Sequence, residues 1–337
     1  MERVKDHDER LPPAPGPRAP LAWAHRIGAR IPLVNAPMGG VAGGRLAAAV
    51  TAAGGLGMIG MGSAGSVRAL ERELPHVHGI DGPFGIGLVD WVVAAEPELL
   101  EAAIAARPAL ISVSFGADLD WATTVTDAGI VAATQVYSVQ DARRAQDAGV
   151  GVLVARGVEG GGHGAVTSTL LPLLDEVLDV ASVPVLAAGG IGTPSSVAAV
   201  LRAGATGAWL GTCLAACEES LLSEAGRRAL LAARGEDTVL TRAYDVGMEL
   251  PWPTRFPARV LRTEFTDRWT GREDELAADR SARAALAAAI AADDPAVAPI
   301  DAGQGVGLVT AVEPVARVLE RLWSGATAHL ADAPAEG

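Results

Sequence analysis

The chain has 337 residues, of which half are hydrophobic and only 4% are aromatic, and its formal net charge is −13. This composition allows a large core of small aliphatic side chains, which suits parallel α/β folds whose strands are buried on both faces. The negative charge argues against binding to nucleic acid or to anionic membrane surfaces, because both require faces rich in Lys and Arg.

The first 20 residues are charged and then rich in proline, and they contain no apolar segment of the kind found in signal peptides. We expect residues 1–20 to form a disordered or loosely attached arm. Further along the chain, no apolar run is long and uninterrupted enough to span a bilayer. The sequence therefore predicts a soluble, cytoplasmic protein that binds neither membranes nor nucleic acid.

Short aliphatic runs alternate with Ala-rich segments of helical period between residues 32 and 210. The predicted strands are 32–36, 57–59, 84–88, 110–114, 130–134, 151–155, 183–187 and 207–210. The predicted helices lie near 43–53, 65–75, 95–106, 118–128, 138–148, 168–181 and 194–203, with another beginning near 213. Several carry end signals, such as Ser138 before and Gly149 after the fifth of them.

A helix after every strand predicts parallel pairing through crossover connections. Eight such units predict an α/β fold, a (β/α)8 TIM barrel over residues 21–220. A doubly wound open sheet is the alternative, but the first strand is followed by "APMGGVAGG", which lacks the full spacing of a dinucleotide fingerprint.

Residues 221–337 break this alternation. Two segments have helical character, "SLLSEAGRRALLAARGE" and "ELAADRSARAALAAAIAA", and "VEPVARVLERLWSG" predicts a closing amphipathic helix. The segment "PWPTRFPARVLRTEFTDRW" between them is irregular. We expect a mostly helical cap over 221–337 that packs against the catalytic mouth of the barrel.

Glycine-rich turns follow the seventh and eighth predicted strands. Ala188, Gly189 and Gly190 end the seventh, and Gly211 and Thr212 follow the eighth. Barrel enzymes often hold a phosphate with these two loops, where glycine admits a close approach and helix amides point at the anion. The pair of turns predicts a phosphate site, although glycine also serves ordinary turns.

Other candidates lie at the ends of the first, fifth and sixth strands. Pro37 and Met38 form the first turn, where Met38 either faces a flat ring or fills the barrel top. Gln135 is a polar exception in an apolar strand and needs a partner, either a ligand or neighbouring backbone. His163 follows three consecutive glycines on the catalytic face and can act as base, acid or hydrogen-bond donor. Cys213 and Cys217 are too few for a metal site and are predicted to be reduced, buried thiols.

Several stretches resemble the nitronate monooxygenase family, also called 2-nitropropane dioxygenase-like, whose members are FMN-dependent (β/α)8 barrels. They are "IPLVNAPMGGVAGGRLAAAVTAAGGLGMIG", "ARGVEGGGHGA", "PVLAAGGIGTPSSVAAVLRAGATGAWLGT" and "DAGQGVGLV". The likeness is strong over about residues 30–220 and loose beyond. It implies a turn beside the flavin ring (Ala36, Pro37, Met38), a polar group near the ring (Gln135), backbone passing the cofactor (Gly161, Gly162), an active-site histidine (His163) and a phosphate cradle (Ala188, Gly189, Gly190, Gly211, Thr212).

Three positions depart from the family pattern. Gly87 stands where the family often has Asn, Arg156 where it often has Gln, and Cys213 where it often has Arg. The asparagine and the glutamine usually contact flavin or substrate. We therefore keep Gly87 and Arg156 as cofactor-binding candidates, while the substrate stays open.

The resemblance implies an FMN-dependent enzyme that oxidises nitronates, or similar stabilised carbanions, with O₂ to a carbonyl compound and nitrite. His163 would bind the anionic nitro oxygens or take the α-proton of a neutral nitroalkane. One alternative is an NAD(P)H-dependent enoyl-[acyl-carrier-protein] reductase type, which shares the "EGGGH"-like loop. Another is a barrel that binds a nucleotide or metabolite without turnover. The predicted partners are a small-molecule substrate and O₂, and a homodimer is left open.

Overall fold

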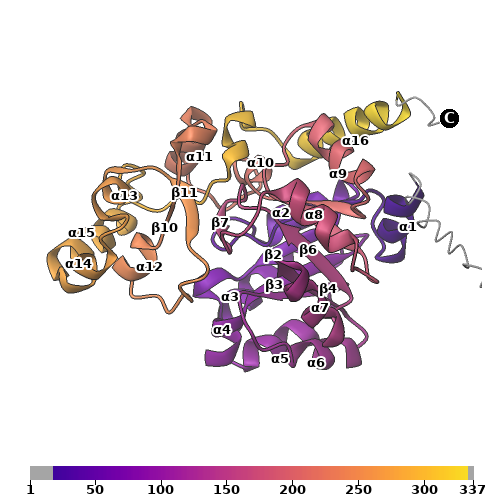
Figure 1. Cartoon of the computed structure of the whole chain (residues 1–337), viewed down its shortest axis with the longest axis horizontal. Helices are drawn as coiled ribbons and strands as arrows, with labels where there is room; N and C mark the ends of the chain where they lie inside the picture. Colours follow the sequence, from indigo (N-terminus) through magenta and orange to yellow (C-terminus); the bar gives the residue numbers. More distant parts are fainter. Residues whose placement is uncertain (1–17, 333–337) are drawn as a thin grey trace, which may run out of the picture.

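A barrel of eight parallel strands forms the centre of the structure, a computed structural model that describes residues 18–332 (Figure 1). The strand order around the barrel is β1-β9-β8-β6-β5-β4-β3-β2. The strands are β1 (Leu33–Asn35), β2 (Gly57–Gly60), β3 (Phe84–Val89), β4 (Leu110–Ser114), β5 (Val131–Val136), β6 (Val152–Arg156), β8 (Val185–Ala188) and β9 (Gly207–Leu210). The predicted (β/α)8 barrel is confirmed, and no strand boundary lies more than two residues from its expected position.

The barrel closes between β1 and β2, where the Asn35 side chain adds hydrogen bonds to a short stretch of backbone pairing. Backbone pairing at this seam consists of a bridge between Val34 and Leu56. The Asn35 Nδ2 donates to the carbonyl oxygens of Ala36 (3.0 Å) and Met58 (2.9 Å), and its Oδ1 accepts from the Met58 amide (2.6 Å). Asn35 is fully buried and is the only asparagine in the chain. One amide side chain thus pins the seam.

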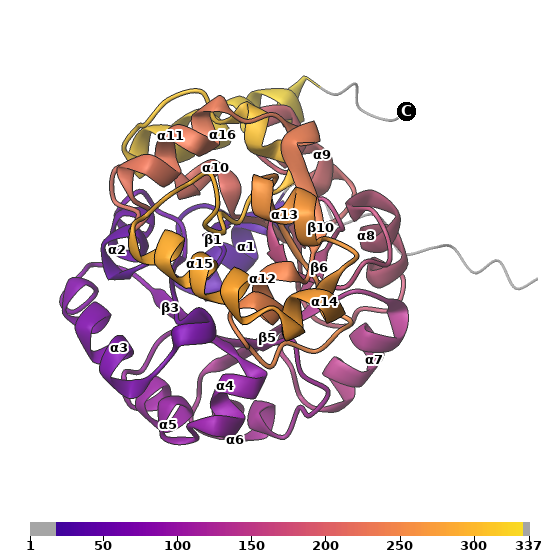
Figure 2. The ribbon, with the colours of Figure 1, turned by 90° about the vertical axis from the view of Figure 1, so that its left-hand side faces the viewer.

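Helices form a ring around the barrel (Figure 2). They are α2 (Gly44–Ala52), α3 (Val67–Glu73), α4 (Asp90–Ala95), α5 (Glu98–Ala105), α6 (Trp121–Asp127), α7 (Val139–Asp147), α8 (Leu170–Leu178) and α9 (Pro194–Arg202). The expected caps are present: Ser138 Oγ accepts from the Asp141 amide at 3.1 Å before α7, and Gly149 has a φ of 86° after it. Two helices, α4 and α5, occupy the region where one was expected.

Helix α1 (Arg18–Arg26) covers the end of the barrel that faces away from the C-terminal extension (Figure 1). Its Trp23 and Ala24 pack against the barrel-lining Val34 and Trp209. Of the arm expected over 1–20, residues 1–17 lie outside the described residues. The expectation is wrong for residues 18–20, which form the first turn of α1, where a proline is tolerated.

The C-terminal extension begins after the short helix α10 (Thr212–Ala215) and covers the opposite end, the mouth (Figures 1 and 2). It contains α11 (Glu224–Ala232), β10 (Thr238–Thr241), α12 (Ala243–Gly247), β11 (Ala258–Leu261), α13 (Glu264–Trp269), α14 (Glu273–Ala278) and α15 (Arg280–Ala291). Strands β10 and β11 form an antiparallel sheet with β7 (Gly162–His163), in the order β10-β11-β7. The sheet joins the extension directly to the histidine loop of the barrel.

The last helix belongs to the barrel and not to the covering layer. Helix α16 (Val315–Ala331) packs against α9 and α2 and so completes the ring (Figure 2). We expected residues 221–337 to form one cap, but they form two parts: a covering layer that contains α11 to α15, and α16, which belongs to the barrel. The reason is that the apolar face of α16 fits the gap between α2 and α9, the first and last barrel helices. Within residues 18–332, no helix combines the length and the apolar character needed to cross a bilayer.

We predict that Asn35→Ala lowers the free energy of unfolding by about 2–4 kcal/mol, because it leaves the buried amide and carbonyl of Met58 without partners. Denaturant unfolding of the purified variant measures this loss. Thr134→Val is the comparison, since it removes a single buried hydrogen bond, from Thr134 Oγ1 to the Val113 carbonyl at 2.7 Å. A loss in Asn35→Ala no larger than in Thr134→Val would show that the backbone alone holds the seam.

Candidate active site

The ends of the barrel strands place six of the expected site residues around the barrel mouth. Side chains alternate along a strand, and positions such as Val34, Ala133, Val154 and Leu186 pack together inside the barrel. The next inward-facing positions, two residues further toward the mouth, are Ala36, Gly87, Gln135, Arg156, Ala188 and Gly211. Residues that are far apart in the sequence therefore surround one opening.

The floor of the mouth is formed by the turn after β1. A Cβ atom at Gly87 would overlap the ring of Pro37. The Pro37 ring thus takes the space that a side chain at position 87 would need, and glycine is required there by close packing. Met38 lies beside Gly211, where a Cβ atom would stand 3.7 Å from the Met38 sulfur.

Arg156 is buried beneath the glycine loop that follows β6. Its Nη2 donates to the carbonyl oxygens of Gly160 (3.0 Å), Gly161 (2.9 Å) and Gly162 (3.0 Å). Burial lowers the pKa of this guanidinium, and the nearby Tyr137 and the carboxylates oppose that shift. The cation is therefore directed at the backbone of the loop and fixes its shape.

The glycines of the loop admit another part of the chain itself. A Cβ atom at Gly161 would approach the Gly303 nitrogen to 2.6 Å. Gly162 has a φ of 70°, which a residue with a side chain rarely adopts. The segment around Gly303 thus lies against the loop, at the place where the family pattern implies a cofactor beside the backbone.

His163 is held on its edge and on its face by the C-terminal extension. Its Nε2 lies 2.9 Å from Oδ1 of the buried Asp245. The Trp252 ring stacks on the imidazole with a centroid separation of 3.5 Å and an interplanar angle of 6°. The other ring nitrogen, Nδ1, makes no hydrogen bond within residues 18–332. His163 therefore has one engaged and one available nitrogen.

Aromatic side chains gather around this histidine. The chain has only 4 Phe, 2 Tyr and 7 Trp, yet five of these rings form one connected cluster beside it: Trp91, Phe115, Tyr137, Trp252 and Phe256. The Trp252 Nε1 donates to Ser63 Oγ at 3.1 Å, which ties the ring to the loop after β2. Phe115 has a φ of 76°, an uncommon and strained conformation for a bulky residue. The cluster forms an apolar wall at the mouth.

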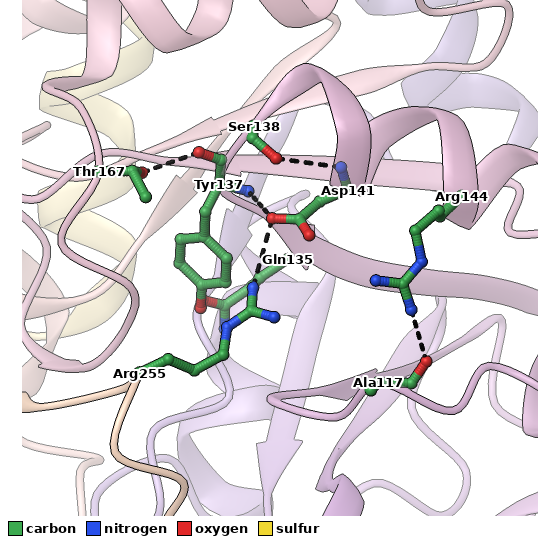
Figure 3. A network of polar contacts seen from close by, with 8 residues as sticks. All are labelled: Ala117, Gln135, Tyr137, Ser138, Asp141, Arg144, Thr167 and Arg255. Atoms are coloured by element: carbon green, nitrogen blue, oxygen red, sulfur yellow. Dashed lines mark hydrogen bonds and ion pairs between the residues drawn. The ribbon is translucent and has the colours of Figure 1, made fainter.

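A polar network beside the wall orients Gln135 (Figure 3). Tyr137 donates its hydroxyl to Gln135 Oε1 at 3.0 Å, and Asp141 Oδ2 accepts from the Tyr137 amide at 3.2 Å and lies 3.5 Å from Arg255 Nη2. Burial raises the pKa of Tyr137, so its phenol stays a neutral donor. The partner of Gln135 Oε1 is thus a side chain, whereas its Nε2 makes no hydrogen bond within the described residues.

The turns after β8 and β9 present unpaired backbone donors. Gly189 and Gly190 have φ values of 118° and 68°. Within residues 18–332, the amides of Gly190, Ile191 and Gly211 donate no hydrogen bond. A cavity of about 350 Å³ opens beside Gly190, lined also by Glu159, Gln304, Gly305, Gly307 and Leu308. These amides are the kind of donors that an anion accepts from.

Thr212 and Cys213 follow these turns, and the Thr212 hydroxyl accepts a hydrogen bond but donates none within the described residues. Thr212 Oγ1 accepts from the Gly303 amide at 2.9 Å and so anchors the segment that covers the cradle. Burial raises the pKa of the Cys213 thiol to about 12, so it is not a nucleophile. Cys217 is buried and also a free thiol.

Several site residues were missed by the sequence reasoning. Asp245 is not among the residues that the sequence predicts for the site. Trp252 and Phe256 lie in the segment "PWPTRFPARVLRTEFTDRW", for which the sequence predicts no regular structure. A signal for the last two existed, since "PWPTRF" brings two aromatic residues together in a chain with few of them. No sequence signal identifies Asp245, because its approach to His163 depends on pairing between strands far apart in the sequence.

Comparisons with known proteins show the family to which this chain belongs. The nitronate monooxygenase family profile matches residues 23–325. A nitronate monooxygenase from Paraburkholderia phytofirmans is 32% identical, covering 64% of this chain and 72% of the relative. A (3aS,4S,5R,7aS)-5-hydroxy-7a-methyl-1-oxo-octahydro-1H-indene-4-carboxyl-CoA dehydrogenase from Mycobacterium tuberculosis is 33% identical, covering 74% and 68%.

Two solved structures match over nearly their whole length. FabK from Thermotoga maritima superposes with a TM-score of 0.80 at 27% identity, covering 92% of this chain and 96% of that one. A nitroalkane oxidase from Streptomyces ansochromogenes gives a TM-score of 0.75 at 28% identity, covering 90% and 98%. Because the family profile spans both the barrel and the extension that carries Asp245 and Trp252, we conclude that this chain belongs to the nitronate monooxygenase family of oxidoreductases.

Proposed function

We propose that this protein is an FMN-dependent enzyme that oxidises alkyl nitronates, or related stabilised carbanions, with O₂ to a carbonyl compound and nitrite. The observation that carries the proposal is a shared mouth: unpaired amides at Gly190, Ile191 and Gly211 stand at the same barrel end as the available Nδ1 of His163. An anion site and a titratable group at one opening suit a phosphorylated cofactor beside a reacting substrate.

The residues present fit FMN at its phosphate end. Among the described residues, the amides of Gly190, Ile191 and Gly211 find no acceptor, and the space at Gly211 is open, because a Cβ atom there would meet its nearest neighbours only at 3.7 Å. The free Nε2 of Gln135 is a donor for a ring carbonyl or nitrogen. When bound, FMN would supply the two-electron oxidation of the substrate and the reaction with O₂.

The side chains of the mouth would bind the substrate and move its proton. The Nδ1 of His163 would accept the α-proton of a neutral nitroalkane, or donate to the nitro oxygens of a nitronate when it is protonated. The buried cation of Arg156 adds positive potential beneath the same loop. The Trp252 and Phe115 rings exclude water from one side and so strengthen these interactions.

A second candidate substrate class is a CoA thioester. This chain matches relatives named as CoA-thioester dehydrogenases at 31% and 33% identity, over a larger share of its length than the Paraburkholderia nitronate monooxygenase. Thioesters, like nitroalkanes, have an acidic α-proton. A substrate panel on the purified flavoprotein separates the classes: bleaching under nitrogen by a nitronate supports the proposal. Bleaching only by an acyl-CoA, or only by NAD(P)H as in the reductase alternative, overturns it.

We predict that Gly211→Val loses FMN while the fold is retained. The added methyl groups would fill the space beside the amide donors, so flavin absorbance per protein should fall at least tenfold. Gly151→Val is a matched control at the other end of the barrel, since a Cβ atom there also meets its nearest neighbour at 3.7 Å. It should keep its flavin. Full flavin content in Gly211→Val, at the thermal stability of the parent, would refute the assignment of the cradle.

We predict that His163→Asn impairs turnover of neutral nitroalkanes by about 10²–10⁴-fold, the usual contribution of a general base. A preformed nitronate has already lost the proton, so its oxidation should fall by much less. Steady-state kinetics on both forms at equal flavin content make the comparison. Equal losses for the two forms would instead assign His163 to stabilising the anion, and a loss below about tenfold, or 1.4 kcal/mol, for both would exclude it from the chemistry.

A further inference from the structure

Asp245 is the only side chain of the described residues to which His163 makes a hydrogen bond. An ionised carboxylate has no proton to donate and can act only as a hydrogen-bond acceptor. The 2.9 Å contact with Oδ1 therefore places a proton on Nε2 of the imidazole. In the neutral ring the proton is then absent from Nδ1, whose lone pair is free. The contact therefore decides which nitrogen can act as a base.

The second oxygen of Asp245 indicates that this contact is not an ordinary structural bond. Oδ2 is buried and has no hydrogen-bond partner within the described residues. Asp245 is only 3% exposed, so the free energy cost of burying it is offset chiefly by one bond to an imidazole. A buried carboxylate held at such cost beside a titratable group is typical of functional sites.

The extension provides the framework that brings Asp245 to the histidine. Strand β11 pairs with β7 so that Ala258 lies opposite His163. Helix α12 carries Asp245 and is held in place by the preceding residue, Tyr244. The Tyr244 hydroxyl lies 2.8 Å from Thr263 Oγ1 and donates to the Val297 carbonyl at 2.8 Å. Helix α12 is thus tied to the segment that follows β11, the strand that pairs with the histidine loop.

Trp252 supplies a second constraint on the same ring. It stacks on the face of the imidazole, whereas Asp245 holds one edge. A half-turn of the ring about its bond to Cβ would keep the stacking but would place Cε1 instead of Nε2 against Asp245 Oδ1, so Trp252 fixes the plane of the ring and Asp245 selects between its two flips. The ring is therefore fixed in one orientation, and Nδ1 occupies a defined place at the mouth.

We propose that Asp245 is a positioning residue, which holds His163 in the Nε2–H tautomer and thereby makes Nδ1 the atom that takes the substrate proton. This rests on the proposed role of His163 as a base. In the step, the substrate C–H bond breaks, its electron pair stays on carbon, and a new N–H bond forms at Nδ1. The resulting imidazolium keeps its Nε2–H bond to the Asp245 carboxylate, which stabilises the positive charge.

The test uses full-length protein labelled with ¹⁵N at histidine. Long-range ¹H–¹⁵N spectra distinguish protonated from unprotonated ring nitrogens, and His163→Asn identifies the signal of His163 among the six histidines. At a pH where the ring is neutral, the parent protein should show a protonated Nε2 and an unprotonated Nδ1. This readout requires neither substrate nor turnover, so it stands even if nitronates are not the substrate.

Asp245→Asn should change both the tautomer and the kinetics. The amide can donate its NH₂ to Nε2 and favour the opposite tautomer. We expect Nδ1 to become protonated and kcat/KM for a neutral nitroalkane to fall about 100-fold or more. Oxidation of the preformed nitronate should fall less than about tenfold. Asp267→Asn is the control, because Asp267 lies in the same extension but its side chain is 57% exposed; it should match the parent in both measurements.

The outcomes separate the two proposals. A parent protein with the proton on Nδ1, or Asp245→Asn with an unchanged tautomer and kcat/KM within threefold of the parent, overturns the role of Asp245. If Asp245→Asn does not fold, Asp245→Ala, which removes the acceptor at Nε2, takes its place, and a kcat/KM for the neutral nitroalkane within threefold of the parent overturns the role of Asp245. If the parent shows the expected tautomer but oxidises neither nitroalkane nor nitronate, the proposed substrate is wrong and the positioning of His163 by Asp245 still holds.

Discussion

Closure of the barrel by Asn35 is the constraint on which the rest of this structure depends. Strand β1 has three residues, and it pairs fully with β9 but meets β2 through one bridge and the two hydrogen bonds that join the Asn35 side chain to Met58. An eight-stranded barrel requires every strand in a fixed stagger. If the seam opened, the inward-facing positions at the mouth would no longer form a ring, and the turn that contains Pro37 would lose its place against Gly87.

The barrel alone does not complete the mouth. Among the expected site residues, the one imidazole is that of His163, and it lies on β7, which pairs with the extension instead of with the barrel. The extension adds what the barrel lacks: a carboxylate at the edge of His163 and a tryptophan on its face. Antiparallel pairing between β11 and β7 is well suited to this task, because a backbone ladder fixes two segments to a fraction of an ångström without using any side chain of the site.

The departures from the family pattern have structural counterparts. Where the resemblance implies an asparagine, Gly87 makes room for the Pro37 ring, and where it implies a glutamine, Arg156 is bound to the carbonyls of the glycine loop. Under the proposed function, contacts to the cofactor ring would then come from Gln135 and from the backbone. Under the same proposal, the aromatic wall around His163 would favour substrates with an apolar part over small polar ones.

The sequence by itself determined the barrel, because each βα unit is a local pattern: an aliphatic run, a cap such as Ser138 and a glycine such as Gly149 depend on neighbours within about 12 residues. It also predicted His163 and the glycine-rich turns after β8 and β9 as candidates for the site, since glycine clusters at strand ends are visible in one dimension. Only the tertiary structure decided that Asn35 closes the seam, that Arg156 turns to the loop, and that Asp245 reaches His163 from 82 residues away. The contacts of Asn35 with Met58 and of Asp245 with His163 join segments far apart in the sequence, and the direction of the Arg156 side chain depends on how the glycine loop folds, so no local pattern in the sequence shows them.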